Sequence, residues 1–289
     1  MPASSARRRA RQLARHGTVA PAKGTTPALV CPLVLAQAAE IEALPAGHFL
    51  TDPTKLANGL RALHGAFGTD VIVTAVADDL AASSLAERSP VAAAAGAVDP
   101  AAAVAGHPRV AAAVEATRRL AATAEDAALA AALCGPAQLA AQLGRPPDPA
   151  ALEECGAVLL ALAKAFLEAG AHLLLVVEAE PLSRAAAGGW RSAVTPLVNV
   201  ARFRQAAAAV VLADPADAAL TPRGAVVCLP PAAAGPGQGI ALEADPAAWP
   251  ASTLRPAGVP LVTSLGPVRG GFAECRAAVG QLIAALAGG

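Results

Sequence analysis

The chain has 289 residues, of which 55% are hydrophobic, with 22 acidic and 22 basic residues. This length can bury a large core, and a single α/β barrel of about 250 residues would use nearly all of it. Zero formal net charge and an aromatic content of 2%, without tyrosine, argue against nucleic-acid binding. Every long apolar stretch is interrupted by proline, glycine or charge, so we expect a soluble protein without a membrane partner.

The N-terminal region is basic. The first 39 residues contain no acid and carry five arginines, at positions 7, 8, 9, 11 and 15. This composition is compatible with an amphipathic transit peptide, and a solvated basic helix is the simpler interpretation. We therefore divide the chain into a basic N-terminal extension, residues 1–26, and a barrel domain, residues 27–289.

Apolar strands alternate with helices along the rest of the chain. Asp52-Pro53 predicts the N-cap and first position of a helix that continues to about Phe67 and stops at Gly68. No glycine-rich dinucleotide motif follows the first strand, so the predicted fold class is α/β, a single (β/α)8 TIM-type barrel with an N-terminal helical extension. We expect further helices over 107–123, 149–169, 188–207 and 270–286, and strands over 28–35, 70–75, 128–134, 172–178, 210–213, 224–229, 239–242 and 259–264.

Acidic residues follow two of these strands. Asp78 and Asp79 come after the second strand, and Glu178 and Glu180 come after the fourth. Because βα loops gather at one end of a barrel, we expect these acids at its mouth. Asp78 is a candidate general acid or base, and Asp79 either binds substrate or caps the next helix. Glu178, a candidate catalytic residue, and Glu180, a candidate substrate-binding residue, share one face in extended geometry and could share a proton or bind a cation.

Two other residues are candidates for the site. His48 precedes the second βα unit and could reach the mouth as an acid or base, although a surface histidine explains it equally. Arg269 lies in the glycine-flanked GPVRGG segment, where late loops of barrels often bind anionic groups, although a simple turn would also need these glycines. We expect Arg269 to bind a substrate carboxylate or phosphate in one pocket with Asp78 and Glu178.

Several of these segments resemble the uroporphyrinogen decarboxylase superfamily, a group of (β/α)8 barrels that also contains cobamide-dependent methyltransferases and the barrel of cobalamin-independent methionine synthase. The resemblance runs from about residue 51 to the C-terminus. It implies a barrel enzyme with lyase or methyl-transfer chemistry and assigns the family's acid after the second strand to Asp78, with Asp79 as the alternative. The segments that carry it are TDPTKLANGLRALHGAFGTDVIVTAVADD, ALCGPAQLAAQL, FLEAGAHLLLVVEAEP and GVPLVTSLGPVRGGFAECRAAVGQL.

The sequence departs from the decarboxylase pattern in three places. The position of the family's arginine-bearing segment reads VCPLVLAQAAE, the active-site tyrosine is missing, and the C-terminal histidine is missing because His172 is the last histidine. A substrate with many carboxylates needs several fixed cations, so we do not expect uroporphyrinogen decarboxylation. We expect a divergent enzyme that acts on a small carboxylated or methylated molecule. The alternatives are a noncatalytic tetrapyrrole- or corrinoid-binding relative and a zinc-dependent methyltransferase.

The cysteines bear on the metal alternative. The five cysteines lack CxxC spacing, which indicates reduced thiols in a cytoplasmic protein. The methyltransferase His-x-Cys motif is missing, and the strand in its place reads AVVCLPP, with Cys228 alone. Cys228, Cys134 and Glu178 all lie at predicted strand ends and could converge on zinc, whereas lone cysteines in alanine-rich strands are usually small buried residues. The resemblance thus admits zinc or a corrinoid as cofactor, and a homodimer is left open.

Overall fold

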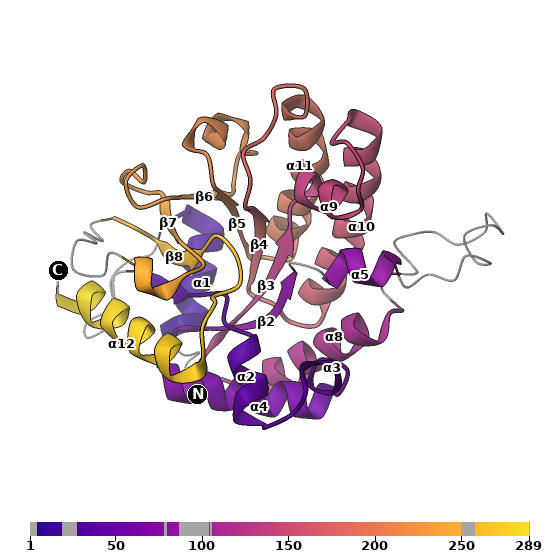
Figure 1. The fold of residues 1–289 in the computed structure, drawn as a ribbon. Helices are drawn as coiled ribbons and strands as arrows, with labels where there is room; N and C mark the ends of the chain where they lie inside the picture. Colours follow the sequence, from indigo (N-terminus) through magenta and orange to yellow (C-terminus); the bar gives the residue numbers. More distant parts are fainter. Residues whose placement is uncertain are drawn as a thin grey trace.

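The protein folds into a barrel of eight parallel strands, which form one sheet in the order β1-β8-β7-β6-β5-β4-β3-β2 (Figure 1). The structure is a computed structural model and describes residues 5–18, 28–77, 80–86, 104, 106–249 and 258–288. Its nearly closed parallel sheet confirms the predicted (β/α)8 TIM-type barrel. The strands are β1 (Leu29–Cys31), β2 (Val71–Ala77), β3 (Ala128–Cys134), β4 (Leu173–Glu178), β5 (Ala207–Leu212), β6 (Val226–Leu229), β7 (Gly239–Leu242) and β8 (Leu261–Ser264).

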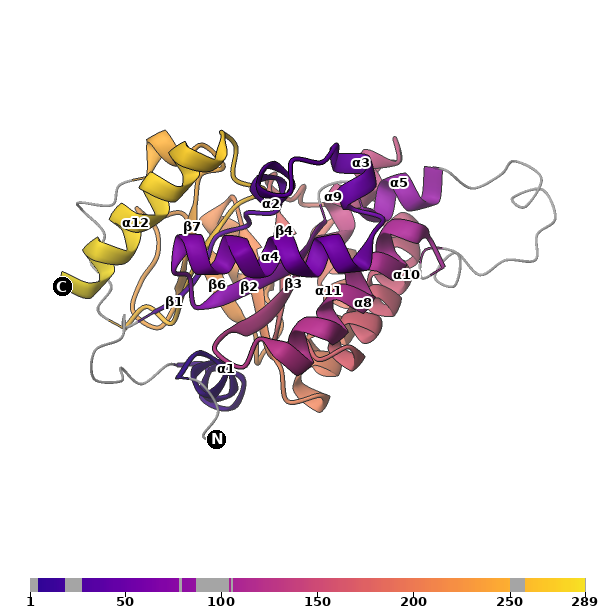
Figure 2. The ribbon, with the colours of Figure 1, turned by 90° about the horizontal axis from the view of Figure 1, so that it is seen from below.

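Helices surround most of the barrel. Helix α1 (Ser5–His16) lies across the amino end of the strands, and the short helices α2 (Ala36–Ile41), α3 (Ala46–Phe49), α5 (Leu80–Ala86) and α9 (Pro136–Gln142) lie at the carboxyl end (Figure 2). The long helices that flank the strands are α4 (Pro53–Phe67), α8 (Pro108–Thr123), α10 (Pro149–Glu168), α11 (Ala187–Phe203) and α12 (Phe272–Gly288). No described helix is both long enough and apolar enough to cross a membrane.

The alternation of strand and helix is incomplete on one side. Among the described residues, the connections after β5, β6 and β7 contain no α-helix. Two of them contain short 3-10 helices, η1 (Pro215–Leu220) after β5 and η2 (Pro246–Ala248) after β7. The helical layer is therefore concentrated around β1 to β5 and β8.

Strand side chains alternate between the barrel interior and the layer under the helices, so both faces of the sheet are apolar. In β4, Leu173, Leu175 and Val177 belong to the interior cluster, whereas Leu174 and Val176 belong to the cluster under the helices. Strands β3 and β5 contribute mainly alanine to the interior. These small side chains do not fill the barrel interior, so another element has to fill it from the amino end.

Helix α1 fills the amino end of the barrel interior. Its residues Ala6, Ala10 and Leu13 belong to the same interior cluster, and Arg9 is only 1% exposed. The expectation of a solvated helix is wrong for this face, because every third or fourth residue is buried against the barrel floor. The boundary that we drew at residue 27 stays a prediction. The guanidinium of Arg7 donates to the carbonyl oxygens of Ala121, Ala124 and Ala127 at 3.0, 2.6 and 3.0 Å.

An ion pair between a buried arginine and a partly buried aspartate closes the seam between β1 and β2. No backbone ladder joins these two strands in the described part of the chain. Asp70, directly before β2, accepts a hydrogen bond from the N–H of Val30 in β1 at 3.1 Å and pairs with Nη1 of Arg9 at 2.9 Å. Nη2 of Arg9 also donates to the carbonyl of Ala28 at 2.5 Å. One carboxylate and one guanidinium thus link β1, β2 and α1.

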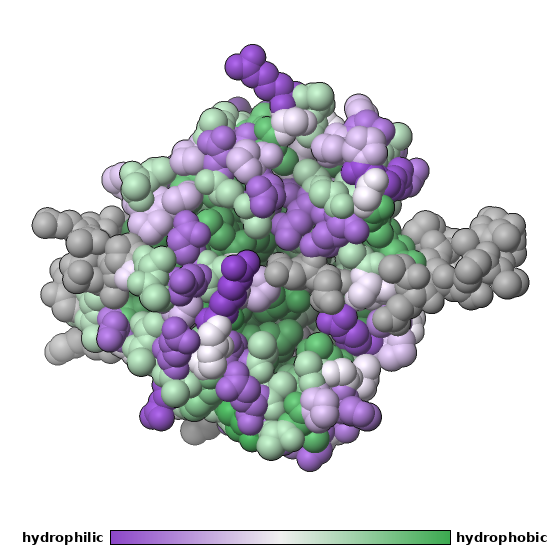
Figure 3. Space-filling model, viewed as in Figure 1, coloured by the Kyte–Doolittle hydropathy of each residue, from purple (hydrophilic) through white to green (hydrophobic). Residues whose placement is uncertain are grey.

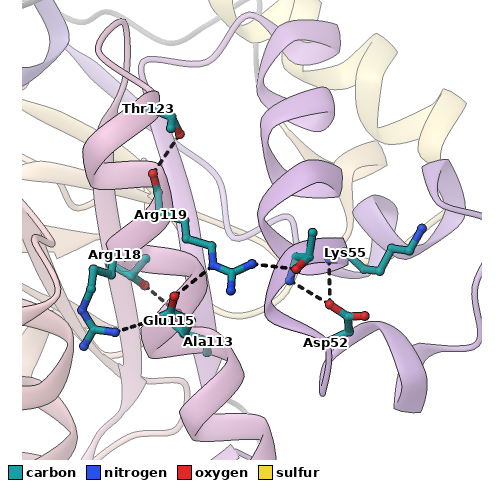
Figure 4. Close-up of polar contacts among 9 residues, drawn as sticks. Asp52, Lys55, Ala113, Glu115, Arg118, Arg119 and Thr123 are labelled. Carbon is teal, nitrogen blue, oxygen red and sulfur yellow. Dashed lines mark hydrogen bonds and ion pairs between the residues drawn. The ribbon is translucent and has the colours of Figure 1, made fainter.

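Helix α4 begins and ends where the sequence predicts. The carboxylate of Asp52 accepts hydrogen bonds from two N–H groups of the first turn, at 2.8 and 3.1 Å, and Gly68 ends the helix with a φ of 68° (Figure 4). Helix α8 packs beside it, and Arg119 donates to Thr54 at 2.6 Å and to Glu115 at 2.9 Å. These contacts connect the helices that follow β1 and β2 in the chain.

Two strands differ from the prediction by three or more residues at one end. The first ends at Cys31 rather than at residue 35, because Pro32 has no N–H for the ladder. Strand β5 begins at Ala207 rather than at residue 210, and its register pairs Ala207 with Leu173. The alanines at its start lack the β-branched signal that identifies strands in a sequence.

Breaking the ion pair at the seam should be costly. We expect Arg9→Met to lower the free energy of unfolding by about 3–5 kcal/mol, because it leaves the carboxylate of Asp70 without its buried partner. The matched control is Arg11→Met in the same helix, where the side chain is exposed and the change should be within about 0.5 kcal/mol. Urea denaturation of the three proteins measures both effects. Equal stability of the two variants would contradict the role of the pair.

Candidate functional site

A pocket of about 470 Å³ opens at the carboxyl end of β4, between α9 and the loop before α11. At this end of the barrel, hydrophobic surface lies recessed between hydrophilic side chains (Figure 3). Ligand pockets commonly combine apolar walls with a few polar groups, and they favour this end of a parallel barrel. The polar side chains among the lining residues are Gln138, Gln142, Glu178, Glu180 and Ser183, and the apolar ones include Pro147, Pro181 and Leu182.

Glu178 is the buried acid of this pocket. Its side chain is at the last position of β4 and the residue is 1% exposed. Oε1 accepts hydrogen bonds from the N–H of Ala137 at 3.0 Å and from Nε1 of Trp190 at 2.7 Å. Oε2 accepts from the N–H of Gln138 at 3.0 Å. The carboxylate therefore accepts hydrogen bonds from N–H groups at the start of α9, which have no partner within the helix. These bonds connect α9 to β4 and α11.

The ionisation of Glu178 reflects two opposing effects. Burial raises the pKa of the carboxyl group to about 7, because the charged form loses its hydration. The three N–H donors, from Trp190, Ala137 and Gln138, act in the opposite direction and favour the charged form. The burial effect is larger, so this group changes its charge near neutral pH.

The turn before α9 is shaped to admit this carboxyl group. A Cβ atom at Gly135 would overlap the carboxyl group of Glu178, so only glycine leaves enough space. The N–H of Gly135 donates to the carbonyl of Val177 at 2.7 Å, and Pro136 then starts the helix without needing an N–H partner. The Cys-Gly-Pro turn after β3 therefore lies in close contact with the end of β4.

Glu178 and Glu180 line the same pocket but differ in environment. Residues two apart on a strand share a face, so Glu178 lies on the same face of β4 as Leu174 and Val176. Its side chain therefore faces the layer under the helices and not the barrel interior. Glu180 is exposed, because the strand ends at Glu178 and the chain bends before Glu180. Because β4 ends before Glu180, the expectation that both acids share one strand face stays a prediction. Their catalytic and substrate-binding roles stay predictions.

Of the other predicted site residues, the structure describes His48 but not Asp78 or Asp79. Asp78 and Asp79 fall outside the described residues, which end at Ala77 in β2 and resume with α5, so their roles stay predictions. His48 is exposed on the short helix α3.

Arg269 does not share the pocket of Glu178. Its side chain is exposed in the loop after β8, and β5, β6 and β7 lie between β8 and β4 in the sheet. The N–H of Arg269 donates to the carbonyl of Ala244 at 2.8 Å, which fixes the loop beside the end of β7. Arg269 is absent from the lining of the pocket, so a single pocket that joins it to Glu178 is wrong. A separate role of Arg269 in anion binding stays a prediction.

The candidate zinc ligands do not come together. Cys228 belongs to the interior cluster beside Gly239, Cys134 belongs to the cluster under the helices, and both are buried and outside any disulfide. Burial raises the pKa of Cys228 to about 12, which disfavours the thiolate that zinc requires. Within the described residues, no group of three or more His, Cys, Asp or Glu side chains is placed to hold a metal. Cys134, Cys228 and Glu178 therefore do not fit a zinc ion.

Sequence reasoning missed the partners of Glu178. Trp190 is one of only two tryptophans, and its buried ring carries a single N–H that must find an acceptor. Gln138 accepts a hydrogen bond from the N–H of Ala179 at 3.2 Å and so fastens the loop after β4. The Trp190 signal was available in the sequence, whereas nothing in it paired Gln138 with residue 179.

A second pocket, of about 520 Å³, lies on the outer surface between α10 and α11. Its walls are mainly apolar, and close contacts such as that between Gly156 and Ala193 bring the two helices together. All of its lining residues belong to α10 and α11, and none of them lies at a strand end or in a βα loop, where barrels place their chemistry. We therefore regard the pocket at Glu178 as the candidate site.

Comparison with known proteins agrees with the fold. No protein-family model matches the sequence, and no curated protein matches it. Solved structures do match, among them a methyltransferase from Methanosarcina mazei with a TM-score of 0.65. The match covers 98% of this chain and 98% of the methyltransferase, at 13% sequence identity. At this identity, the likeness shows a common barrel fold over nearly the whole of both chains.

A side chain at Gly135 should disturb the turn and destabilise the protein. We expect Gly135→Ala to cost about 1–3 kcal/mol, because the added methyl group overlaps the carboxyl group of Glu178. The control is Gly188→Ala in the first turn of α11, where a Cβ meets no atom within 4 Å. Alanine at this helical position should be neutral or stabilising by up to about 1 kcal/mol. Thermal or urea unfolding of both variants decides the comparison.

Glu178 should make stability depend on pH. Its folded pKa of about 7 lies above the ordinary value of 4.5, so the folded protein keeps a proton that the unfolded chain loses between these values. The stability that this group contributes is full below the lower value and is lost as the pH rises through the upper one. Relative to Glu178→Gln, the wild type should therefore lose free energy of unfolding between about pH 5 and about pH 8.

Urea denaturation of the two proteins at both pH values measures this difference. The histidines titrate identically in both proteins, so their contribution cancels. A difference that does not change with pH would contradict the raised pKa of Glu178.

Proposed function

We propose that the chain is a divergent member of the uroporphyrinogen decarboxylase and cobamide-dependent methyltransferase superfamily, and that it transfers a methyl group between small molecules at the carboxyl end of the barrel. The observation that carries this proposal is the likeness to a methyltransferase over 98% of both chains. The sequence resemblance, which was identified separately, supports the same superfamily. Because one fold hosts many reactions, the site residues have to supply the rest of the argument.

In this proposal Asp78 handles the proton of the reaction. When a nucleophile takes a methyl group, the bond to the donor breaks with its electron pair on the donor, and the nucleophile releases its proton. An acid or base directly after β2 can accept that proton or deliver it to the donor, which typically contributes about 10²–10⁴ in rate. The substrate would be small and carry few carboxylates, since none of the described residues that line the pocket at Glu178 is an arginine.

A noncatalytic binding protein is the second candidate. The observation that favours it is the engagement of Glu178, whose two oxygens already accept three hydrogen bonds within the fold. A carboxylate used in this way shapes a pocket and does not need to exchange protons with a ligand. In this case the protein would hold a tetrapyrrole or corrinoid, and substitution of Asp78 would change binding without any turnover.

Substitution of Asp78 tests the proposed reaction. Purified full-length protein is incubated with methylcobalamin and 2-mercaptoethanol, and demethylation is followed by the absorption of the corrinoid. We expect turnover by the wild type, a loss of about 10²–10⁴ in Asp78→Asn, and a much smaller effect in Asp79→Asn. Circular dichroism checks that both variants fold like the wild type.

Two results would contradict the proposal. One is demethylation at the same rate with and without the protein, together with a corrinoid absorption spectrum that changes on binding, which would favour the noncatalytic candidate. The other is formation of coproporphyrinogen from uroporphyrinogen by the wild type, which would establish decarboxylation. Full activity of Asp78→Asn would remove Asp78 from the mechanism.

A further inference from the structure

The outward face of α1 carries three exposed arginines across the amino end of the barrel, opposite the candidate site. Arg8, Arg11 and Arg15 follow the spacing of one helical face, and all three are exposed. At 1.5 Å per residue they extend over about 10 Å of the helix. Gln12 and His16 border them, and the helix contains no acid.

These arginines are not needed by the fold itself. Arg7 and Arg9 point inward and bind backbone carbonyls and Asp70, as described above. Within the described part of the chain, Arg8, Arg11 and Arg15 form no ion pair. Of the inward arginines, Arg9 pairs with Asp70, and Arg7 donates to backbone carbonyls. Three long charged side chains thus remain free to bind an external group.

The acids at this end of the barrel are mostly engaged. Asp126, in the turn before β3, lies within ion-pair distance of Arg61 at 3.9 Å and of His64 at 3.6 Å. Glu168, at the end of α10, pairs with Arg204 at 2.5 Å. Glu125 is exposed beside Asp126 and is the acid that would compete for the arginine face.

The positive charge of this face acts on a histidine at the amino end of the barrel. His172 lies at the start of β4, and its Nδ1 accepts a hydrogen bond from the N–H of Leu129 at 3.1 Å. The pKa of His172 is lowered to about 4, mainly by burial and in addition by the charges of Arg7 and Arg11. Arg11 therefore contributes to a positive potential at the amino end, although the whole chain has zero formal net charge.

We propose that Arg8, Arg11 and Arg15 form a docking face for an acidic segment of a partner protein. Guanidinium groups bind carboxylates with two parallel hydrogen bonds, and three of them in a row match a short run of Asp and Glu residues. An anionic membrane is a poorer occupant, because the apolar residues of α1 are buried in the barrel and none remain to enter the lipid. Nucleic acid is a poorer occupant, because the chain as a whole has zero formal net charge and only 2% aromatic residues.

Binding of a labelled hexaglutamate peptide tests this proposal. The full-length protein is titrated into the peptide at low salt, and fluorescence anisotropy reports binding. We expect saturable binding that weakens as salt is added, and at least a tenfold loss of affinity in the triple variant Arg8→Gln, Arg11→Gln and Arg15→Gln. The matched control removes the same charge from three exposed arginines on other faces, Arg184→Gln, Arg191→Gln and Arg276→Gln, and should bind like the wild type.

Three outcomes would overturn the proposal. Equal loss of binding in the two triple variants would mean that the peptide senses net charge only. No binding of hexaglutamate by the wild type at low salt would exclude an acidic protein segment. Binding of a DNA duplex or of phosphatidylserine vesicles that depends on Arg8, Arg11 and Arg15 and is tighter than that of hexaglutamate would assign the face to a different occupant. The readout is independent of any enzymatic turnover, so it does not depend on the proposed function.

Discussion

The carboxylate of Asp70 is the group on which closure of this barrel depends. Strands β1 and β2 lack a backbone ladder in the described residues, so the sheet would otherwise end in two free edges. Asp70 supplies one hydrogen bond to β1 and holds Arg9, which is 1% exposed, and Arg9 in turn fastens α1 and the chain before β1. A single charge pair, with a buried arginine and a partly buried aspartate, therefore connects β1, β2 and the N-terminal helix.

At the carboxyl end of the barrel, a carboxylate again connects several elements of the fold. Glu178 accepts N–H groups from the start of α9 and from Trp190, and thereby ties the strand end to two helices. The two carboxylates differ in their described partners, since Asp70 pairs with an arginine whereas Glu178 accepts hydrogen bonds from three N–H groups. Burial therefore dominates at Glu178 and raises its pKa, and the carboxyl end carries the group whose charge changes near neutral pH.

The two ends suggest a division of labour in the molecule. The carboxyl end holds the pocket, with acids and amides around apolar walls, and suits a small ligand. The amino end presents exposed arginines on α1 that the fold itself does not need. This end suits a macromolecular partner of opposite charge. A helix that has one face in the barrel floor and the other in solvent can serve both structure and recognition.

The sequence alone determined the local elements and their order. Asp52, Pro53 and Gly68 predicted the limits of α4 because capping and left-handed geometry are local properties, and β2 was recognisable by its β-branched residues. Tertiary structure decided which charges meet. Arg9 and Asp70 are 61 residues apart, and Ala137 and Glu178 are 41 residues apart, so no local pattern pairs them. The direction of Glu178 also depended on the residue at which β4 ends, because one residue reverses the face of a strand.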